Sequence, residues 1–271
     1  MTISIVTPSF NHGRFLEWTL RSVLLQDFPQ LEYVVMDGGS QDRTKEILVQ
    51  YAPRLTHVES APDRGQADAI VRGFAHTHGD IMAYLNSDDM LAPGALSFVA
   101  KFFDEHPRVD VLYSHRVFVD EDNLVGSYWI LPPHSNWLMK RWDYIPQETC
   151  FWRRRIYEQA GGVDPSFQFA LDYDLFSRFM ERGRLVRVNR FLGAFRRHAA
   201  SKTAGLAGVH PEIGRVRRAH HLKPHWLPER ILHDWIARRS HSFATSGRTL
   251  PGAMRGINYN YDQVWNGRLN D

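Results

Sequence analysis

The sequence predicts an α/β protein with a mixed central sheet and a helical tail. Over the first ninety residues, short β-rich runs alternate with amphipathic helical segments, a pattern typical of parallel sheets covered by helices. A polar motif comes after each of the first four predicted strands. Beyond residue 109 this regular alternation stops. The second part of the sheet is therefore expected to be mixed.

The first half has four predicted strands separated by three predicted helices. The strands are residues 3–7, 31–36, 55–59 and 81–85. A first helix is predicted over residues 16–24, where apolar residues recur at helical spacing after the breaker pair His12-Gly13. The other two helices are residues 43–51 and 66–76. In such doubly wound sheets, ligands bind beyond the carboxyl ends of the strands.

The second half has shorter and less regular predicted elements. Its strands are residues 109–114, 117–119, 125–130, 185–188 and 191–195. A helix is predicted over residues 173–181. The tail is predicted to form polar helices separated by Pro224, Pro228 and Pro251.

The composition narrows the class of protein. Of the 271 residues, 43% are hydrophobic and 23% charged, as in an ordinary folded domain. The single cysteine, Cys150, cannot form an internal disulfide, and the first ten residues do not resemble a leader peptide. No apolar stretch approaches the roughly 20 residues of a membrane-spanning helix. We expect a cytoplasmic protein, with any membrane contact peripheral and on the inner face.

The net charge of +3 hides an asymmetry. Residues 196–271 contain 13 of the 33 lysines and arginines but only 5 of the 30 acidic residues. Such a tail can meet anionic lipid, a polyanionic acceptor or another subunit, for example in a homodimer. Alternatively, the charges form a solvated helical face. No nucleic acid is expected as a partner, because the acidic body would repel phosphate.

Asn86-Ser87-Asp88-Asp89 follows the fourth predicted strand and offers the oxygen ligands that Mg²⁺ and Mn²⁺ prefer. A divalent ion there would neutralise the charge of a diphosphate. The alternative is a turn or capping motif, in which Asp and Asn are common. Asp37-Gly38-Gly39-Ser40 is also open to two interpretations: a strand-to-helix turn, or a site where Asp37 accepts a hydrogen bond from a nucleotide base.

Seven motifs occur in a specific order along the chain. They are Thr7-Pro8-Ser9-Phe10-Asn11, Asp37-Gly38-Gly39-Ser40-Gln41-Asp42, Asp63-Arg64-Gly65-Gln66, Leu85-Asn86-Ser87-Asp88-Asp89, Gln147-Glu148-Thr149, Gly161-Gly162-Val163-Asp164 and Leu171-Asp172-Tyr173-Asp174-Leu175. Together they resemble the family-2 glycosyltransferases, which have the Rossmann-like GT-A fold. The resemblance covers residues 2–198 and is strongest up to residue 93.

The resemblance implies an inverting, metal-dependent and non-processive glycosyltransferase of the hexosyltransferase type. It divides the chain into a nucleotide-sugar-binding half (1–108), an acceptor-binding and catalytic half (109–205) and a basic helical extension (206–271). The implied donor is a UDP-sugar, with a GDP- or dTDP-sugar as the alternative. The implied acceptor is a glycan or a lipid-linked molecule, in cell-surface polysaccharide or glycolipid assembly.

Roles follow from the resemblance residue by residue. Those implied to bind the nucleotide are Thr7, Pro8, Ser9, Asp37, Gly38, Arg64, Asp68, Asn86 and Ser87. Those implied to hold Mn²⁺ or Mg²⁺ are Asp88, Asp89 and His198. Asp172 is the implied general base, and the implied acceptor residues are Glu148, Trp152 and Asp174. His198 has an alternative interpretation as a surface histidine in a basic segment.

Two departures from the family pattern keep other interpretations open. The family often has an acid at the position of Asn86, and often Glu-Asp where this chain has Leu171-Asp172. Asp174 and Glu148 are therefore alternative bases. The rival functions are a sugar nucleotidyltransferase and a catalytically inert nucleotide-sugar-binding scaffold. The aromatic residues Trp129, Trp137, Trp142, Tyr144 and Trp152 form either an acceptor platform or part of the core.

Overall fold

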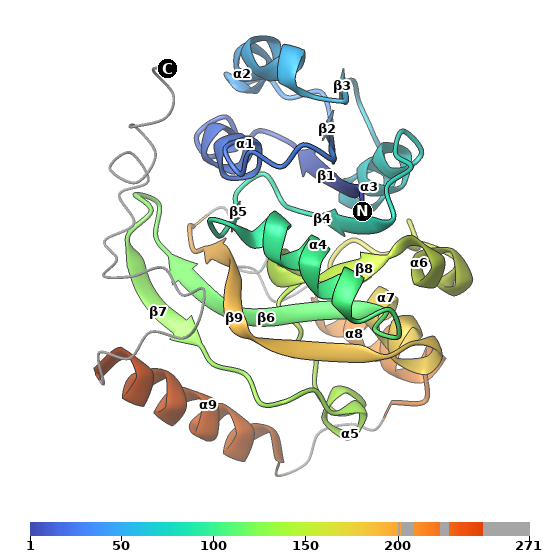
Figure 1. The fold of residues 1–271 in the computed structure, drawn as a ribbon, viewed down its shortest axis with the longest axis vertical. Coiled ribbons are helices and arrows are strands. Elements are labelled where there is room, and N and C mark those ends of the chain that lie inside the picture. Colours follow the sequence, from blue (N-terminus) through green and yellow to red (C-terminus); the bar gives the residue numbers. More distant parts are fainter. Residues whose placement is uncertain (200, 202–208, 223–227, 246–271) are drawn as a thin grey trace.

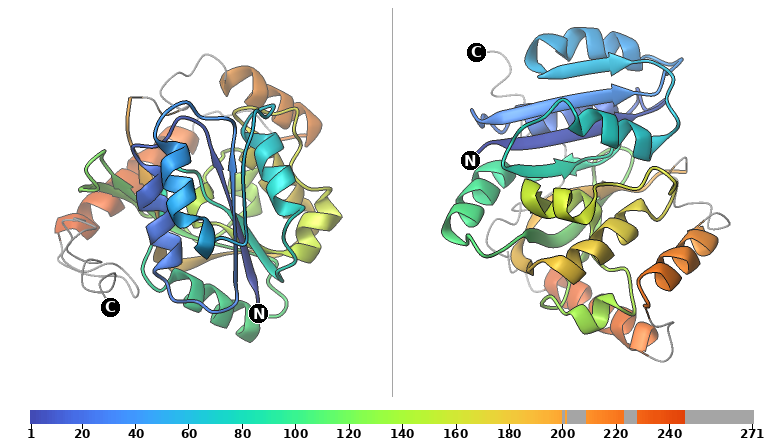
Figure 2. Two further views of the ribbon diagram at one scale, coloured as in Figure 1. Left: turned by 90° about the horizontal axis from the view of Figure 1, so that it is seen from above. Right: turned by 90° about the vertical axis from the view of Figure 1, so that its right-hand side faces the viewer.

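The computed structural model describes residues 1–199, 201, 209–222 and 228–245. Within them, nine strands form a single sheet, and helices cover both of its faces (Figures 1 and 2). The sheet contains parallel and antiparallel pairs. The predicted α/β fold with a mixed central sheet is confirmed.

The first half forms the parallel part of the sheet. Its strands are β1 (Ile3–Ser9), β2 (Leu31–Asp37), β3 (His57–Ser60) and β4 (Ile81–Tyr84), and they lie in the order β3-β2-β1-β4. The connecting helices are α1 (Leu16–Leu24), α2 (Thr44–Tyr51) with a 3₁₀ turn (Ala52–Arg54) after it, and α3 (Gln66–Phe74). All seven predicted elements are present, within two residues of their predicted bounds. Because β1 and β4 are parallel neighbours, their carboxyl ends meet at one edge of the sheet.

The second half continues the sheet, mainly with antiparallel pairs. Its strands are β5 (Met90–Leu91), β6 (Val111–Val119), β7 (Val125–Trp129), β8 (Phe151–Arg153) and β9 (Leu185–Arg196). From β4 outward the order is β8-β6-β9-β5, and β7 pairs with β6 beside this path. The helical segments are α4 (Ala95–Glu105), α5 (Asn136–Met139), a 3₁₀ turn (Gln147–Thr149), α6 (Arg154–Ala160) and α7 (Leu171–Arg182).

Two predictions for this half are wrong in the same way. Residues 109–119 and 185–195 were each predicted as two strands, but β6 and β9 are each continuous. The predicted breaks fall at polar residues, which find partners inside the sheet. His115 of β6 is 1% exposed and its Nε2 lies 3.0 Å from Oδ1 of Asn189 on β9. The β6–β9 register shifts around His115, so the break in hydrophobic pattern marks an irregularity rather than an end.

The strands divide the core into two layers. Successive side chains of a strand point to opposite faces of the sheet, and each face is covered by different helices. On one face, Ile3, Ile5, Tyr33 and Val35 pack with buried residues of α1, α2 and α4. On the other, Val6, Val34, Met36 and Tyr84 pack with α3, α6 and α7. Burial on both faces explains why the parallel strands are continuous apolar runs.

The tail adds two helices, α8 (Val209–Ala219) and α9 (Pro228–Thr245). Val216 of α8 and Ile236 of α9 are buried in the same layer as α7, so both helices belong to the main core. Pro228 is the first residue of α9, a position that suits proline, whereas Pro224 and Pro251 lie outside the described residues. None of the described helices combines the length and apolar character needed to cross a membrane.

Candidate active site

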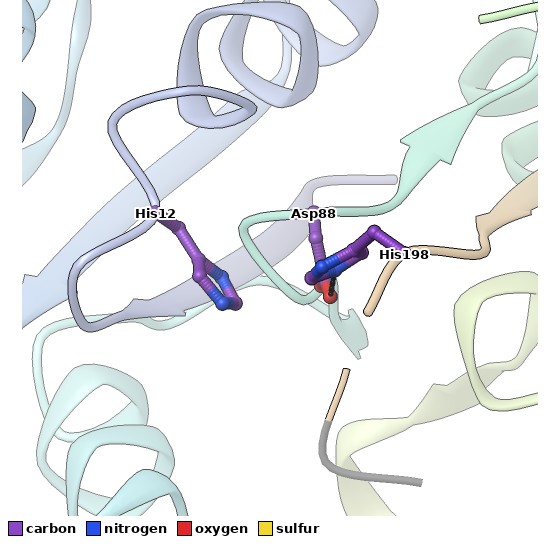
Figure 3. A group of neighbouring side chains, drawn as sticks. All are labelled: His12, Asp88 and His198. Atoms are coloured by element: carbon purple, nitrogen blue, oxygen red, sulfur yellow. Dashed lines mark hydrogen bonds and ion pairs between the residues drawn. The ribbon is translucent and has the colours of Figure 1, made fainter. Parts of the chain in front are cut away.

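Three side chains with metal-ligating atoms meet where three strands end. His12 comes after β1, Asp88 after β4 and His198 after β9. Nε2 of His198 lies 2.9 Å from Oδ2 of Asp88, and the ligand atoms of all three residues lie within 4.8 Å of one another. Figure 3 shows the His12 ring pointing towards the Asp88–His198 pair. Two imidazoles and a carboxylate can hold a divalent ion such as Mn²⁺.

A buried arginine joins the end of β9 to the turn that carries Asp88. Arg196 is 0% exposed. Its backbone N–H donates to Oδ1 of Asp89 (3.0 Å), and its Nε donates to the carbonyl of Asp88 (2.9 Å). Because the residues after Arg196 lead directly to His198, these bonds fix the distance between the two ligands.

The two histidine rings have further supports. Nδ1 of His12 lies 2.8 Å from the hydroxyl of Ser87, which sets the orientation of that ring. The His198 ring packs against Phe15, with centroids 4.5 Å apart. Loop and helix residues around the cluster therefore pre-position it, which lowers the cost of binding an ion or a diphosphate.

The pKa values of the two neighbouring aspartates are shifted in opposite directions. Burial opposes the ionisation of Asp88, but the hydrogen bond with His198 and the nearby His12 lower the pKa of this carboxyl. Burial, followed by the charges of Asp88 and Glu148, raises the pKa of Asp89 well above its ordinary value. Asp89 is 1% exposed and directed at Arg196. Two of the three predicted metal ligands, Asp88 and His198, lie together. The third, Asp89, instead supports the turn. His12, which was not predicted as a ligand, completes the cluster.

From the sequence, His12 is predicted only as part of the breaker pair that precedes the first helix. The signal that identifies it is its place in the loop after β1, the same kind of position that marked the other rim motifs. A histidine after one strand can meet an aspartate after the neighbouring parallel strand, because the carboxyl ends of the two strands share an edge.

The predicted nucleotide-binding residues of β1 and β2 lie side by side. Asp37 is 2% exposed and accepts hydrogen bonds from the hydroxyl of Ser60 (2.6 Å) and from the backbone N–H and hydroxyl of Ser40. The N–H of Gly38 donates to the carbonyl of Ser9. Gly38 lies so close to Asp63 that an added Cβ would be 3.0 Å from its carboxylate. A side chain at position 38 would thus crowd this rim.

Other predicted nucleotide-binding residues are partly engaged with one another. Thr7 is fully buried, with Oγ1 3.0 Å from the Tyr33 hydroxyl, and Pro8 is buried beside it. Arg64 donates two hydrogen bonds from its guanidinium to Oδ1 of Asp68, at 3.1 and 2.7 Å. This contact lowers the pKa of Asp68. The Arg64 side chain is 85% exposed, so a ligand can reach it.

Asn86 links the first half to the second. Its Oδ1 accepts from Nε2 of Gln66 at 2.6 Å, and its Nδ2 donates to Oε1 of Gln147 at 3.2 Å. Gln147 in turn donates to the carbonyl of Tyr84 at 2.6 Å. An amide can both donate and accept, as this chain of contacts requires. The asparagine at position 86 therefore makes two contacts, one as acceptor and one as donor, and an ionised acid could make only the first.

Asp172, the predicted base, lies in the first turn of α7. Its Oδ1 accepts the backbone N–H of Tyr173 at 2.9 Å. Burial raises its pKa, although this N–H and the charge of Arg116 act in the opposite direction. Asp143 was missed by sequence analysis, because it stands between Trp142 and Tyr144 without a motif. Burial and the charge of Asp172 raise the pKa of Asp143 well above its ordinary value, so the second half contains two carboxyls with raised pKa values.

Glu148 is a buried partner of Arg116. The guanidinium donates to Oε1 at 2.7 Å and to Oε2 at 2.6 Å, a bidentate pair in which the glutamate side chain is 1% exposed. Burial opposes the charge of Arg116, but Glu148, Asp89 and Asp172 raise its pKa. Glu148 is therefore committed to an ion pair within the site.

Trp152 and Asp174, two predicted acceptor residues, are held inside the protein. Trp152 is 0% exposed and packs among aromatic rings of the core, so its faces are covered. Asp174 is 5% exposed and bonds to Arg178 and to Nε2 of His220 (3.0 Å). Trp142 and Tyr144 are also buried. Trp142, Tyr144 and Trp152 are therefore part of the core rather than an exposed acceptor platform.

The tail supports the segment before Asp172. Glu212 of α8 accepts the backbone N–H groups of three successive residues, 168 to 170, at 2.7 to 3.1 Å. These groups directly precede α7, whose first-turn N–H groups have no partner within the helix. A carboxylate from α8 thus fixes the entry to the helix that carries Asp172.

Comparison with known proteins matches this chain to a family. The family model described as "Glycosyl transferase family 2" matches residues 4–160. Among curated relatives, a "PGL/p-HBAD biosynthesis glycosyltransferase" of Mycobacterium bovis is 29% identical over 187 residues, which are 68% of this chain and 71% of the relative. The match to the family ends before Asp172 and His198.

Two solved structures show a similar fold. Staphylococcus aureus TarS (residues 1–349), solved in complex with UDP-GlcNAc, has a TM-score of 0.68 at 19% identity and covers 90% of this chain and 73% of its own. The mannosyltransferase PcManGT from Pyrobaculum calidifontis, solved with GDP-Man and Mn²⁺, has a TM-score of 0.56 at 21% identity and covers 94% of this chain and 67% of its own.

Proposed function

The chain belongs to glycosyl transferase family 2, and we propose that it transfers single sugars from a nucleoside-diphosphate donor to an acceptor hydroxyl, with inversion at the anomeric carbon. The chain has the GT-A fold that the family resemblance implied. The observation that carries the proposal is the meeting of His12, Asp88 and His198 at the edge where β1, β4 and β9 end. This edge is where ligands bind in α/β sheets.

The donor would lie along the rim formed by the first half. Asp37 and Asp68 are carboxylates suited to accept hydrogen bonds from the base and ribose, and the exposed Arg64 is suited to meet a phosphate. Similar structures contain UDP-GlcNAc, UDP or GDP-Man, which supports a nucleotide sugar as donor. We favour a UDP-sugar, with GDP- and dTDP-sugars as alternatives.

The residues present fit a divalent cation at the diphosphate. His12, Asp88 and His198 would hold it, because their ligand atoms converge within 4.8 Å. A bound Mn²⁺ or Mg²⁺ neutralises negative charge on the leaving diphosphate. The Mn²⁺ in the similar mannosyltransferase supports this assignment. Arg196 holds the backbone carbonyl of Asp88 through its Nε, at 2.9 Å.

The acceptor would approach from the second half. Asp172 would accept the proton of the attacking hydroxyl, and its raised pKa suits this role. Inversion then needs one displacement and no covalent enzyme intermediate. We propose a glycan or lipid-linked acceptor in cell-surface polysaccharide or glycolipid assembly, supported by the relative in PGL/p-HBAD biosynthesis. We propose peripheral contact of the basic tail with a membrane.

The first experiment measures binding of UDP, GDP, dTDP and CDP by calorimetry, with and without Mn²⁺. We expect one diphosphate to bind with Mn²⁺ and its affinity to fall by about tenfold or more when the metal is removed. Asp88→Ala should lose this metal dependence. Asp104→Ala, which changes an exposed aspartate of α4, is the matched control and should bind as the wild type does.

The outcomes separate the rival functions. Binding of no diphosphate under any condition would contradict the donor site. Binding followed by release of pyrophosphate from a nucleoside triphosphate would identify a nucleotidyltransferase instead. Binding without transfer or donor hydrolysis would identify an inert sugar-nucleotide-binding protein.

A further inference from the structure

A second group of potential metal ligands lies at the outer edge of the sheet. His57 and Glu59 are on β3, and His76 comes just after α3. The ligand atoms of these three residues lie within 4.8 Å of one another. Figure 1 shows β3 at the edge of the sheet with α3 beside it. None of the three belongs to the candidate active site.

The fold brings these residues together by simple periodicity. His57 and Glu59 are two residues apart on a strand, so their side chains project from the same face. After α3 the chain turns, and the N–H of His76 donates to the carbonyl of Gly73 at 3.1 Å. This turn places the His76 ring over the His57 ring, with centroids 3.8 Å apart and planes at 12°.

One ring nitrogen of this cluster has no hydrogen-bond partner among the described residues. It is Nε2 of His57, which is buried. A buried polar atom without a partner destabilises the folded protein. A cation bound at Nε2 of His57 would remove this cost, and the exposed His76 ring would turn out of the stack to share the cation.

We propose that His57, Glu59 and His76 bind a Zn²⁺ ion. Two imidazoles and one carboxylate are a ligand set that zinc accepts, with water or another solute in the fourth position. The exposure of His76 leaves that position open to solvent. The ion would add a metal link between the edge strand β3 and the end of α3, which the Arg72–Glu59 ion pair also joins.

Arg72 competes with this ion. It forms an ion pair with Glu59, and its other terminal nitrogen lies 3.6 Å from Oδ2 of Asp68. When Glu59 turns to the ion, Arg72 therefore keeps Asp68 as a partner. Removing the arginine should strengthen zinc binding, because the carboxylate is then free for the metal.

The test uses the full chain carrying Asp88→Ala, so that the candidate active-site cluster does not contribute, after chelation and dialysis. Calorimetric titration with Zn²⁺ should show one bound equivalent. His76→Ala in this background should weaken binding by about tenfold or more. His78→Ala, which changes an exposed neighbouring histidine, should leave the affinity unchanged. His76 is exposed, so its loss should not prevent folding, which circular dichroism checks.

Two results would overturn the proposal. One is that the Asp88→Ala protein binds no Zn²⁺, and the other is that His76→Ala and His78→Ala bind it equally well. Arg72→Gln should tighten binding, and unchanged or weaker binding would exclude Glu59 as a ligand. The test measures metal binding alone, so its outcome is independent of the proposed transfer reaction.

Discussion

Two carboxylates of the first half, Asp42 and Asp68, and two of the second, Asp143 and Asp172, have pKa values shifted in opposite directions. In the first half, the hydrogen bond from Arg64 lowers the pKa of Asp68. Burial opposes the ionisation of Asp42, but hydrogen bonds from Thr44 and Gly13 lower its pKa overall.

In the second half, burial raises the pKa of Asp172, and burial together with the charge of Asp172 raises that of Asp143. This difference in pKa indicates different functions for the two sets of carboxylates. Carboxylates that stay ionised suit the recognition of a nucleotide, whereas carboxylates with raised proton affinity suit a general base.

The sharpest challenge to this division is Asp172→Asn. We expect transfer to fall by about 10²- to 10⁴-fold, the usual contribution of a general base, while the affinity for the nucleoside diphosphate stays nearly unchanged. Asp68→Asn should do the reverse, weakening diphosphate binding more than the transfer step. Single-turnover kinetics and calorimetry separate the two effects. Full turnover by Asp172→Asn would remove this residue from the mechanism.

The next effect concerns the stability of the second half. Glu148→Ala leaves the buried Arg116 without its partner, and we expect the free energy of unfolding to fall by about 3–5 kcal/mol. Glu105→Ala is the control, because its contact with Lys101 is exposed and 3.8 Å long; about 0.5 kcal/mol is expected there. Denaturant unfolding measures both. Equal losses would mean that the buried pair does not stabilise this half.

A pH profile tests the same contrast on a smaller scale. Asp172 must be deprotonated to act, and its pKa is raised, so kcat should fall as pH decreases through a value above the ordinary aspartate pKa of about 3.9. Below that value the loss should be about tenfold per pH unit. At saturating Mn²⁺ and donor, Asp172→Glu should shift this limb and Asp68→Asn should not. If the pH at which kcat falls is the same in Asp172→Glu, a group other than Asp172 acts as the base.

The first half was predictable because its signals are local. Each strand is an apolar run and each helix has its own periodicity, so all seven elements could be placed from the sequence. The second half depends on contacts between distant residues. β8 has only three residues, and the partners of Arg116 and His115 lie 32 and 74 positions away. Helix α4 (Ala95–Glu105) was not predicted either.

The candidate site divides in the same manner. Asp88 could be predicted from its motif, and His198 and Asp172 from the family resemblance. Asp143 could not, since it belongs to no motif and only the folded chain brings it near Asp172. His12 was missed, although its place in the loop after β1 is a signal that identifies it. The burial of Trp152 was one of two interpretations that the sequence left open, because an aromatic residue suits both a core and a sugar-binding surface.

The bonds of Arg196 to Asp88 and Asp89 also have a consequence for synthesis of the chain. The parallel strands β1 to β4 lie in the first 84 residues and can pair early, as the chain leaves the ribosome. The cluster of His12, Asp88 and His198 cannot close until β9 has emerged and taken its place. We therefore expect the parallel strands to pair before the side chains of His12, Asp88 and His198 can meet.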